Sequence, residues 1–253
     1  MPRILLFVLL AIFGALLTTY MVPWKKLSKH TNEPVVVGDL HIAIMCDGNR
    51  RYGEKKGDGK LGGYTKGGNN TFKCMAWCND MNVKVLTLFV FGEDNFKRDM
   101  KELKHLFNVM ENIVGTHKAY IMENNIQFKL LTTTQSVPDV AKNVFSECRT
   151  LQKDTQDHTG MVFQLGLGYG GTSDIEQAAL KTGTFKNNLK TKGIQNPDIL
   201  IRTSGEKRLS NFMLYQLAYT ELFFLDMYWP EFTKRDLVNV VYEYNRRNKR
   251  FGK

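Results

Sequence analysis

His41-Ile42-Ala43-Ile44-Met45-Cys46-Asp47-Gly48-Asn49-Arg50-Arg51 is the stretch that decides the fold. Its apolar run leads directly into an acid, a glycine, an amide and two arginines. A short continuous apolar run is typical of a parallel strand that is covered on both faces. Ligands of open α/β sheets bind beyond the carboxyl ends of such strands. We therefore predict Asp47 at a ligand site; the alternative is an ordinary turn followed by solvated basic residues.

The residue types after this strand indicate which ligand would bind. Gly48 allows the backbone to approach a ligand closely. The guanidinium groups of Arg50 and Arg51 can grip an anion with planar pairs of donors. A carboxylate beside two guanidiniums favours a phosphate group bridged by a metal ion.

The overall composition narrows the class of protein. The chain has 253 residues, of which 43% are hydrophobic, and a net charge of +10. This content is enough for a sizeable core and excludes a disordered chain. The positive charge suits nucleic acid, anionic membrane or phosphorylated substrates without choosing among them. The four cysteines form no C-x-x-C pair, which favours reduced thiols over a zinc ribbon or a disulfide framework.

The first segment of the chain has the composition of a membrane helix. Residues 4–22 form an uncharged run of nineteen residues, long enough to cross a bilayer core of about 30 Å. Lysines follow this run, so the positive-inside tendency places the rest of the chain on the cytosolic side. The alternative is a cleaved secretory signal, for which the run is long. We expect a membrane anchor over 1–24, a linker over 25–40 and the globular domain over 41–253.

A glycine-rich, lysine-rich stretch follows the first strand. Residues 53–70 hold seven glycines, and this composition predicts a mobile basic loop. Such a loop either cradles a phosphate with its backbone N–H groups or is simply flexible. The next segment, residues 71–81, has the composition of a helix.

The rest of the chain alternates between short apolar runs and segments with helical potential. Strands are predicted over 83–91, 126–131, 161–167, 198–201 and 222–225. Asp99 is a candidate N-cap for a long helix with apolar residues at helical spacing. This alternation is typical of a mostly parallel sheet with right-handed crossovers.

The densest polar segment follows the predicted strand at 198–201. Arg202 ends that strand, and Arg208 and Ser210 are predicted to open a helix. Two arginines and a hydroxyl at a helix N-terminus would form a diphosphate receptor; the alternative is a surface salt-bridge cluster. Glu221 stands before a buried strand, which requires an arginine or a metal as its partner.

Together these motifs resemble the cis-prenyltransferases, the undecaprenyl and dehydrodolichyl diphosphate synthases. Residues 41–52 resemble the opening motif of that family. Phe91–Arg98 is similar to its Phe-Ser-x-Glu-Asn-Trp-x-Arg motif, and 197–212, Glu221 and 229–232 match its later signature. No Asp-Asp-x-x-Asp motif occurs, which argues against the trans-type synthases.

The resemblance implies a fold, an activity and partners. The fold would be six parallel strands flanked by helices around a hydrophobic tunnel, here preceded by the transmembrane helix. The enzyme would elongate farnesyl diphosphate with isopentenyl diphosphate to a long-chain polyprenyl diphosphate, the precursor of a dolichol-type glycosyl carrier lipid. It would work as a homodimer, anchored in the endoplasmic reticulum membrane with its catalytic domain in the cytosol.

The resemblance also implies roles for single residues. Asp47 would hold Mg²⁺ with help from Glu221, and Asn49 and Asn95 would act in catalysis. The residues implied to bind or support the substrate diphosphates are Gly48, Arg50, Arg51, Lys60, Tyr64, Arg98, Arg202, Arg208, Ser210, Arg250 and Gly252. The last two belong to an Arg-x-Gly ending that would reach a diphosphate across the dimer interface. Four positions depart from the family pattern: Gly92, Asp94, Phe96 and Tyr64.

Two other functions remain possible on the sequence alone. A non-catalytic partner subunit of a two-subunit enzyme would keep the fold as an interaction surface, but it has no physical need for Asp47, Arg202 or Arg208. A basic module that binds membrane or nucleic acid would scatter its charge among aromatic stacking platforms. The arginines here are predicted at strand ends instead, so no nucleic acid partner is expected.

Overall fold

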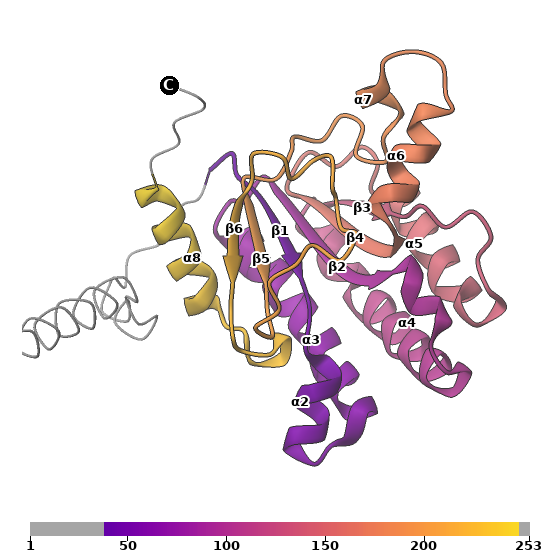
Figure 1. Cartoon of the computed structure of the whole chain (residues 1–253), viewed down its shortest axis with the longest axis vertical. Coiled ribbons are helices and arrows are strands. Elements are labelled where there is room, and N and C mark those ends of the chain that lie inside the picture. The colour runs from indigo at the N-terminus through magenta and orange to yellow at the C-terminus, as the bar shows by residue number, and fades with distance from the viewer. Residues whose placement is uncertain (1–37, 248–253) are drawn as a thin grey trace, which may run out of the picture. The chain divides into compact units, whose positions relative to one another are not determined.

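The centre of the molecule is a parallel sheet, seen in a computed structural model that describes residues 38–247 (Figure 1). The sheet contains β1 (His41–Met45), β2 (Val85–Gly92), β3 (Gln127–Leu131), β4 (Val162–Tyr169), β5 (Ile199–Arg202) and β6 (Glu221–Phe224). Their order is β3-β4-β2-β1-β5-β6, and each neighbouring pair is parallel. The predicted six-stranded parallel sheet is thus confirmed.

Helices connect the strands. They are α2 (Asn49–Lys56), α3 (Gly59–Asp80), α4 (Met100–Glu123), α5 (Lys142–Asp154), α6 (Gly171–Ala179), α7 (Phe185–Asn188) and α8 (Lys234–Arg246), with short 3₁₀ turns η2 (Glu93–Lys97), η3 (Asp139–Ala141) and η4 (Trp229–Glu231). Helix α4 lies between α3 and α5 and contacts both. Its predicted N-cap is confirmed, because the Asp99 carboxylate accepts hydrogen bonds from the backbone N–H groups of Lys101 and Glu102.

The prediction of a mobile loop over residues 53–70 is wrong. The stretch forms the end of α2 and the first half of α3. Its glycines serve close helix packing: a Cβ on Gly53 would lie 2.0 Å from the carbonyl oxygen of Gly59, and one on Gly63 would lie 2.0 Å from that of Asn49. The glycine content therefore reflects two helices in backbone contact.

The predicted transmembrane helix and the membrane-anchored location in the endoplasmic reticulum require correction. No helix within residues 38–247 is long and apolar enough to cross a membrane. The two longest helices there, α3 and α4, both carry charged side chains along their length. The apolar segment on which the prediction rested, residues 4–22, lies outside the described residues. The fold that the structure supports is the parallel sheet with its helices.

The connection between β5 and β6 also differs from prediction. Residues 203–220 form turns, and no helix begins at Arg208 or Ser210. Four residues that are not glycine have positive φ there: Ser204 (φ 82°), Ser210 (φ 45°), Asn211 (φ 61°) and Met213 (φ 44°). Such conformations interrupt a helix, so Ser210 is placed by a turn.

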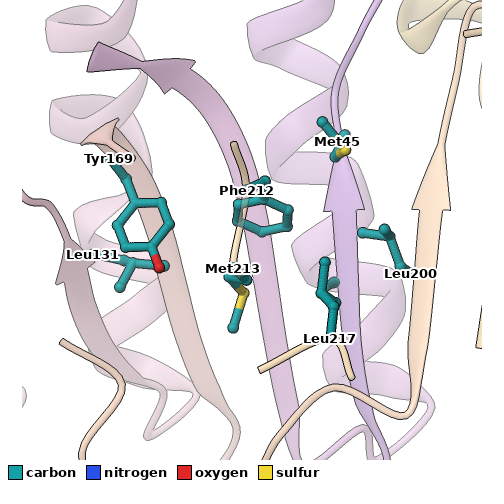
Figure 2. Close-up of a cluster of buried hydrophobic side chains, with 8 residues drawn as sticks. Met45, Leu131, Tyr169, Leu200, Phe212, Met213 and Leu217 are labelled. Atoms are coloured by element: carbon teal, nitrogen blue, oxygen red, sulfur yellow. The ribbon is translucent and has the colours of Figure 1, made fainter. Parts of the chain in front are cut away.

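A buried apolar cluster holds this connection against the sheet (Figure 2). Phe212 stacks on Phe89 of β2, with ring centroids 4.5 Å apart, and meets the ring of Tyr169 edge-on. Ala43 and Met45 of β1 belong to the same cluster, as expected for alternate residues of a strand. The cluster fixes the turn that follows Ser210 relative to the end of β1.

Candidate active site

Asp47 and Arg202 meet beyond the carboxyl ends of β1 and β5. Met45 of β1 is in register with Arg202 of β5, so these neighbouring strands end at the same level. One carboxylate oxygen of Asp47, Oδ2, lies 2.9 Å from Nη2 of Arg202. The other, Oδ1, lies 3.4 Å from Nη2 of Arg51. The carboxylate therefore stands between two guanidinium groups, but only Arg51 belongs to the predicted pair. Arg202 takes the place expected for Arg50, which pairs with Glu102 instead.

The local backbone explains why these residues take this arrangement. Gly48 has φ 97°, and a Cβ there would lie 2.7 Å from Cδ1 of Tyr228; this position thus requires glycine. The hydroxyl of Thr203 donates to the carbonyl oxygen of Asp47 over 2.8 Å and accepts from the Asp47 N–H over 3.0 Å. These bonds tie the end of β1 to the end of β5.

A second group of polar side chains extends from Arg202. Its Nη1 donates to Oγ of Ser210 over 2.9 Å and also to the backbone carbonyl of Arg208. The Glu206 carboxylate pairs with Arg208 on one side and with Arg51, at 2.9 Å, on the other. The hydrogen bond from Arg208, and then the charge of Arg51, lower the pKa of Glu206. Glu206 therefore links the β1 and β5 parts of the site.

A third group gathers around Glu102 at the start of α4. Its carboxylate lies 3.6 Å from a guanidinium nitrogen of Arg50 and 3.5 Å from one of Arg98. The hydroxyl of Tyr64 donates to it over 2.5 Å and accepts from Arg98 over 3.1 Å. Burial, followed by this bond to Glu102, raises the pKa of Tyr64. Tyr64 is therefore a neutral donor.

Several polar atoms of the site have no protein partner. The carbonyl oxygen of the Asn49 side chain, the Nε of Arg202 and the hydroxyl oxygen of Ser204 are buried and make no hydrogen bond. Among residues 38–247 only five side-chain atoms share this condition, and these three belong to residues at or just after the carboxyl ends of β1 and β5. Because an unsatisfied buried polar group is costly, their concentration here indicates a polar ligand.

A cavity of about 570 Å³ begins at these polar groups and continues into an apolar interior. Its deeper part is bounded by α3, α4 and the sheet, through residues such as Met75, Val109, Ile113, Phe128 and Phe163. The side chain of Asn95, a predicted catalytic residue, accepts from the Gly92 N–H over 3.0 Å at the cavity wall. The cavity thus joins a cationic mouth to an apolar tunnel.

Most of the predicted site residues line this cavity. They are Asp47, Gly48, Asn49, Arg50, Arg51, Tyr64, Asn95, Arg98, Arg202, Arg208 and Ser210. Lys60 does not line it; its ammonium lies 3.8 Å from Glu54. Arg250 and Gly252 lie outside the described residues. Glu102 and Glu206 were not predicted, although Glu102 stands four residues after Arg98 and Glu206 stands between two predicted arginines.

The structure does not bring Glu221 together with Asp47 within this chain. Glu221 begins β6 and is in register with Ile199, the first residue of β5. In a parallel sheet it therefore lies at the edge opposite to the end of β5, where Arg202 contacts Asp47. Its carboxylate pairs with Arg247 at 2.6 Å. Of the two predicted partners for this acid, the structure shows an arginine.

A cationic site above an apolar tunnel defines a protein that binds an anionic head group together with an apolar chain. Comparison with known families agrees with this class. Residues 44–252 match the family model described as putative undecaprenyl diphosphate synthase. An isoprenyl transferase of Bacillus subtilis (strain 168) is 33% identical over 245 residues, which cover 90% of this chain and 93% of that protein.

Two solved structures have the same fold. Lavandulyl diphosphate synthase from Lavandula x intermedia, in complex with dimethylallyl diphosphate, superposes with a TM-score of 0.79 at 29% identity, covering 86% of this chain and 99% of the other. A probable undecaprenyl diphosphate synthase from Campylobacter jejuni gives a TM-score of 0.68 at 25% identity, covering 88% and 100%. The chain belongs to the undecaprenyl diphosphate synthase family, the cis-prenyltransferases, and is a prenyl-transferring enzyme.

Proposed function

We propose that this enzyme elongates farnesyl diphosphate with isopentenyl diphosphate to a long-chain polyprenyl diphosphate, which serves the synthesis of a dolichol-type glycosyl carrier lipid. The observation that carries this proposal is the position of Asp47 between Arg51 and Arg202, at the mouth of a tunnel with apolar walls. The mouth fits diphosphates, and the tunnel fits an isoprenoid chain that grows away from them.

The two diphosphates would occupy the two sides of Asp47. Asn49 and Arg51, with the N–H of Gly48, would hold the allylic diphosphate, while Arg202, Arg208 and Ser210 would hold isopentenyl diphosphate. Bidentate contacts from guanidinium groups suit diphosphate oxygens. Fixed positive charges at this point stabilise the negative charge that develops on the departing diphosphate. The acids that now pair with Arg51 and Arg208 would give up these contacts to the substrates.

Mg²⁺ fits the residues of the mouth. Within residues 38–247 no three His, Cys, Asp or Glu side chains are placed to share a metal ion. A metal here would therefore take the single carboxylate of Asp47 and complete its coordination with substrate oxygens and water, which is how Mg²⁺ is usually bound at phosphate sites. When bound, it would neutralise charge on the leaving diphosphate.

We further propose that residues 41–253 are the catalytic domain and 25–40 a linker, and that the enzyme is a homodimer. The family match over residues 44–252 supports the domain assignment. Arg250 and Gly252 are proposed to reach a diphosphate of the second copy. Analytical ultracentrifugation of the purified protein tests the dimer, and removal of the last four residues tests the tail through activity.

Product analysis tests the proposed reaction. The purified full chain is incubated with labelled isopentenyl diphosphate, Mg²⁺ and an allylic diphosphate, and the products are sized after removal of their diphosphates. Farnesyl, dimethylallyl and geranylgeranyl diphosphates are compared as primers. We expect efficient elongation from farnesyl diphosphate and no incorporation when Mg²⁺ is chelated. Absence of product with every primer would favour a non-catalytic subunit.

A further inference from the structure

The turn that carries Ser210 has an unusual backbone. The N–H of Phe212 donates to the carbonyl oxygen of Leu209 over 3.0 Å, which closes a four-residue turn with Ser210 and Asn211 at its centre. Both central residues have positive φ, 45° and 61°, the pattern of a type I′ turn. Residues other than glycine seldom adopt this left-handed conformation, although asparagine tolerates it better than most. The turn therefore needs support from contacts outside it.

Asn211 provides that support by binding the first turn of α6. Its backbone carbonyl oxygen accepts from the N–H of Gly171 over 2.6 Å, and its side-chain Oδ1 accepts from the N–H of Thr172 over 2.8 Å. The first N–H groups of a helix have no partner within the helix, so Asn211 satisfies two of them. These bonds join the turn to the start of α6.

The start of α6 is also bound to the end of β2. One carboxylate oxygen of Glu93, Oε2, accepts from the hydroxyl of Ser173 over 2.6 Å, and the other accepts from the hydroxyl of Thr133 over 2.5 Å. The hydroxyl oxygen of Thr133 accepts in turn from the N–H of Gly170 over 2.8 Å. A Cβ on Gly170 would lie 2.4 Å from Oε2 of Glu93, so the two segments are in close contact. Asn211 therefore binds a helix start that is itself bound to the sheet.

Ser210 connects this anchored turn to the substrate site. Its hydroxyl oxygen accepts from Nη1 of Arg202 over 2.9 Å, and both residues line the cavity. Asn211 is half-buried and does not line the cavity, so it can act on a substrate only through its neighbour. We propose that Asn211 is a positioning residue for isopentenyl diphosphate, because it holds the Ser210 hydroxyl beside Arg202 by anchoring the turn on α6. The inference rests on the proposed function.

Two substitutions separate the role of the Asn211 backbone from that of its side chain. Asn211→Gly keeps the left-handed backbone and removes the bond to Thr172, whereas Asn211→Ala removes this bond and also disfavours the backbone conformation. We expect the KM for isopentenyl diphosphate to rise about threefold in the first variant and about tenfold in the second, the size of effect expected when a hydrogen bond to a charged group is lost. The KM for the allylic substrate and kcat should stay within about twofold of the wild-type values.

Asn188→Ala is the matched control, because Asn188 binds the other end of α6. Its side-chain amide donates to the carbonyl oxygens of Ala178, Lys181 and Thr182, each over 3.2 Å. This variant should lower the unfolding temperature, as Asn211→Gly does, and leave the KM for isopentenyl diphosphate unchanged. An equal rise in KM in both variants would overturn the assignment, because destabilisation of α6 in general would then explain it.

A double variant tests whether Asn211 acts through Ser210. Ser210→Ala removes the hydroxyl that the turn positions, so adding Asn211→Ala to it should raise the KM for isopentenyl diphosphate by less than a further twofold. A further tenfold rise would mean that Asn211 acts independently of this hydroxyl, and the positioning role would be wrong.

The two proposals fail in different ways. A wild-type enzyme that elongates its substrate, with folded Asn211 variants whose KM for isopentenyl diphosphate is unchanged, would overturn the positioning role alone. A wild-type enzyme that incorporates no isopentenyl diphosphate would overturn the proposed function and the positioning role with it.

Discussion

The two edges of the sheet differ in whether their buried polar groups have hydrogen-bond partners within the protein. At the amino edge, Nδ1 of His41 donates to the carbonyl oxygen of Gln195 over 2.7 Å, and its Nε2 lies 2.8 Å from the hydroxyl of Thr87. Thr87 in turn bonds Gln164 over 2.9 Å. At the carboxyl edge, Asp47, Asn49 and Arg202 face a cavity, and buried atoms of the last two have no partner.

This difference distinguishes buried polar groups that stabilise the fold from those that are available to bind a ligand. A buried polar group that finds its partners within the protein supports the fold, whereas one that lacks a partner stores a free-energy cost that a ligand can relieve. Substitutions at the amino edge should therefore change stability and leave turnover alone. Substitutions at the carboxyl edge should chiefly change turnover, with a loss of stability only where the side chain is also buried in protein contacts.

Asp47→Asn should produce the largest loss. The amide keeps the shape of the side chain and can still accept from Arg202, but it lacks the charge that would hold Mg²⁺. We expect product formation at saturating Mg²⁺ to fall by about a hundredfold or more. The free energy of unfolding in urea should fall as well, because the guanidinium of Arg202, which is 4% exposed, loses its counter-charge. Asp80→Asn, which weakens a surface pair with Lys234, is the control; an Asp47 variant as active as this control would exclude the metal role.

Substitutions of Arg202 and Arg208 should differ in their effects on stability. Arg208 is exposed and its side chain pairs with Glu206, whereas the Arg202 side chain is 4% exposed and contacts Asp47, Ser210 and a backbone carbonyl. Arg208→Ala should raise the KM for isopentenyl diphosphate about ten- to a hundredfold, from roughly 1.5–3 kcal/mol of charge-assisted hydrogen bonding. Arg202→Ala should do the same and also lower the unfolding temperature. Effects on unfolding alone in both variants would indicate a structural salt-bridge cluster.

The contribution of His41, at the amino edge, to the free energy of unfolding should depend on pH. Burial lowers the pKa of His41 from 6.5 to about 4, so the unfolded chain binds a proton at a pH where the folded protein does not. The stability contributed by the neutral ring is complete above about pH 6.5 and is lost as the pH falls toward 4. Between pH 7 and pH 5 this amounts to about 2 kcal/mol.

Urea unfolding at these two pH values, for the wild type and for His41→Gln, measures that contribution. The variant should lose about 2 kcal/mol less than the wild type over this interval. Equal slopes for the two proteins would show that His41 is not held neutral by the fold.

The sequence predicted the sheet well because its signals are local. Each strand is a short apolar run, and the polar residues that follow β1 and β5 meet because parallel strands end at a common edge. The same reasoning failed for residues 53–70, since the glycines serve a contact between α2 and α3 that only the folded chain reveals. It also failed after Arg202, where a buried Phe212 holds a turn in place of the expected helix.

The candidate site was predicted less completely than the sheet. Its anion-binding groups follow from residue type and position, but Glu102 and Glu206 act through arginines that are brought to them by other elements. The role of Glu221 came from the family resemblance, and the position of that residue at the start of β6 could be known only from strand register. Contacts between distant segments are what the sequence did not reveal.

Substitution of Tyr64 should have the smallest effect on activity. This residue combines features of both edges. Its hydroxyl lies at the carboxyl edge, yet it already has protein partners, donating to Glu102 and accepting from Arg98. Tyr64→Phe removes both bonds, a net loss of about 0.5–1.5 kcal/mol. If the bonds only orient Arg98, kcat/KM for the allylic substrate should fall a few fold while the KM for isopentenyl diphosphate stays constant.

The comparison with Glu102→Gln tells whether Tyr64 acts alone or through that carboxylate. The amide of this variant removes the charge that pairs with Arg50 and Arg98, so both arginines become freer to move. We expect a loss at least as large as that of Tyr64→Phe, and a double variant no worse than Glu102→Gln, because residues in one hydrogen-bonded network are not additive. Strictly additive losses would mean that the Tyr64 hydroxyl binds the diphosphate directly, and would place it with the unsatisfied groups around Asp47.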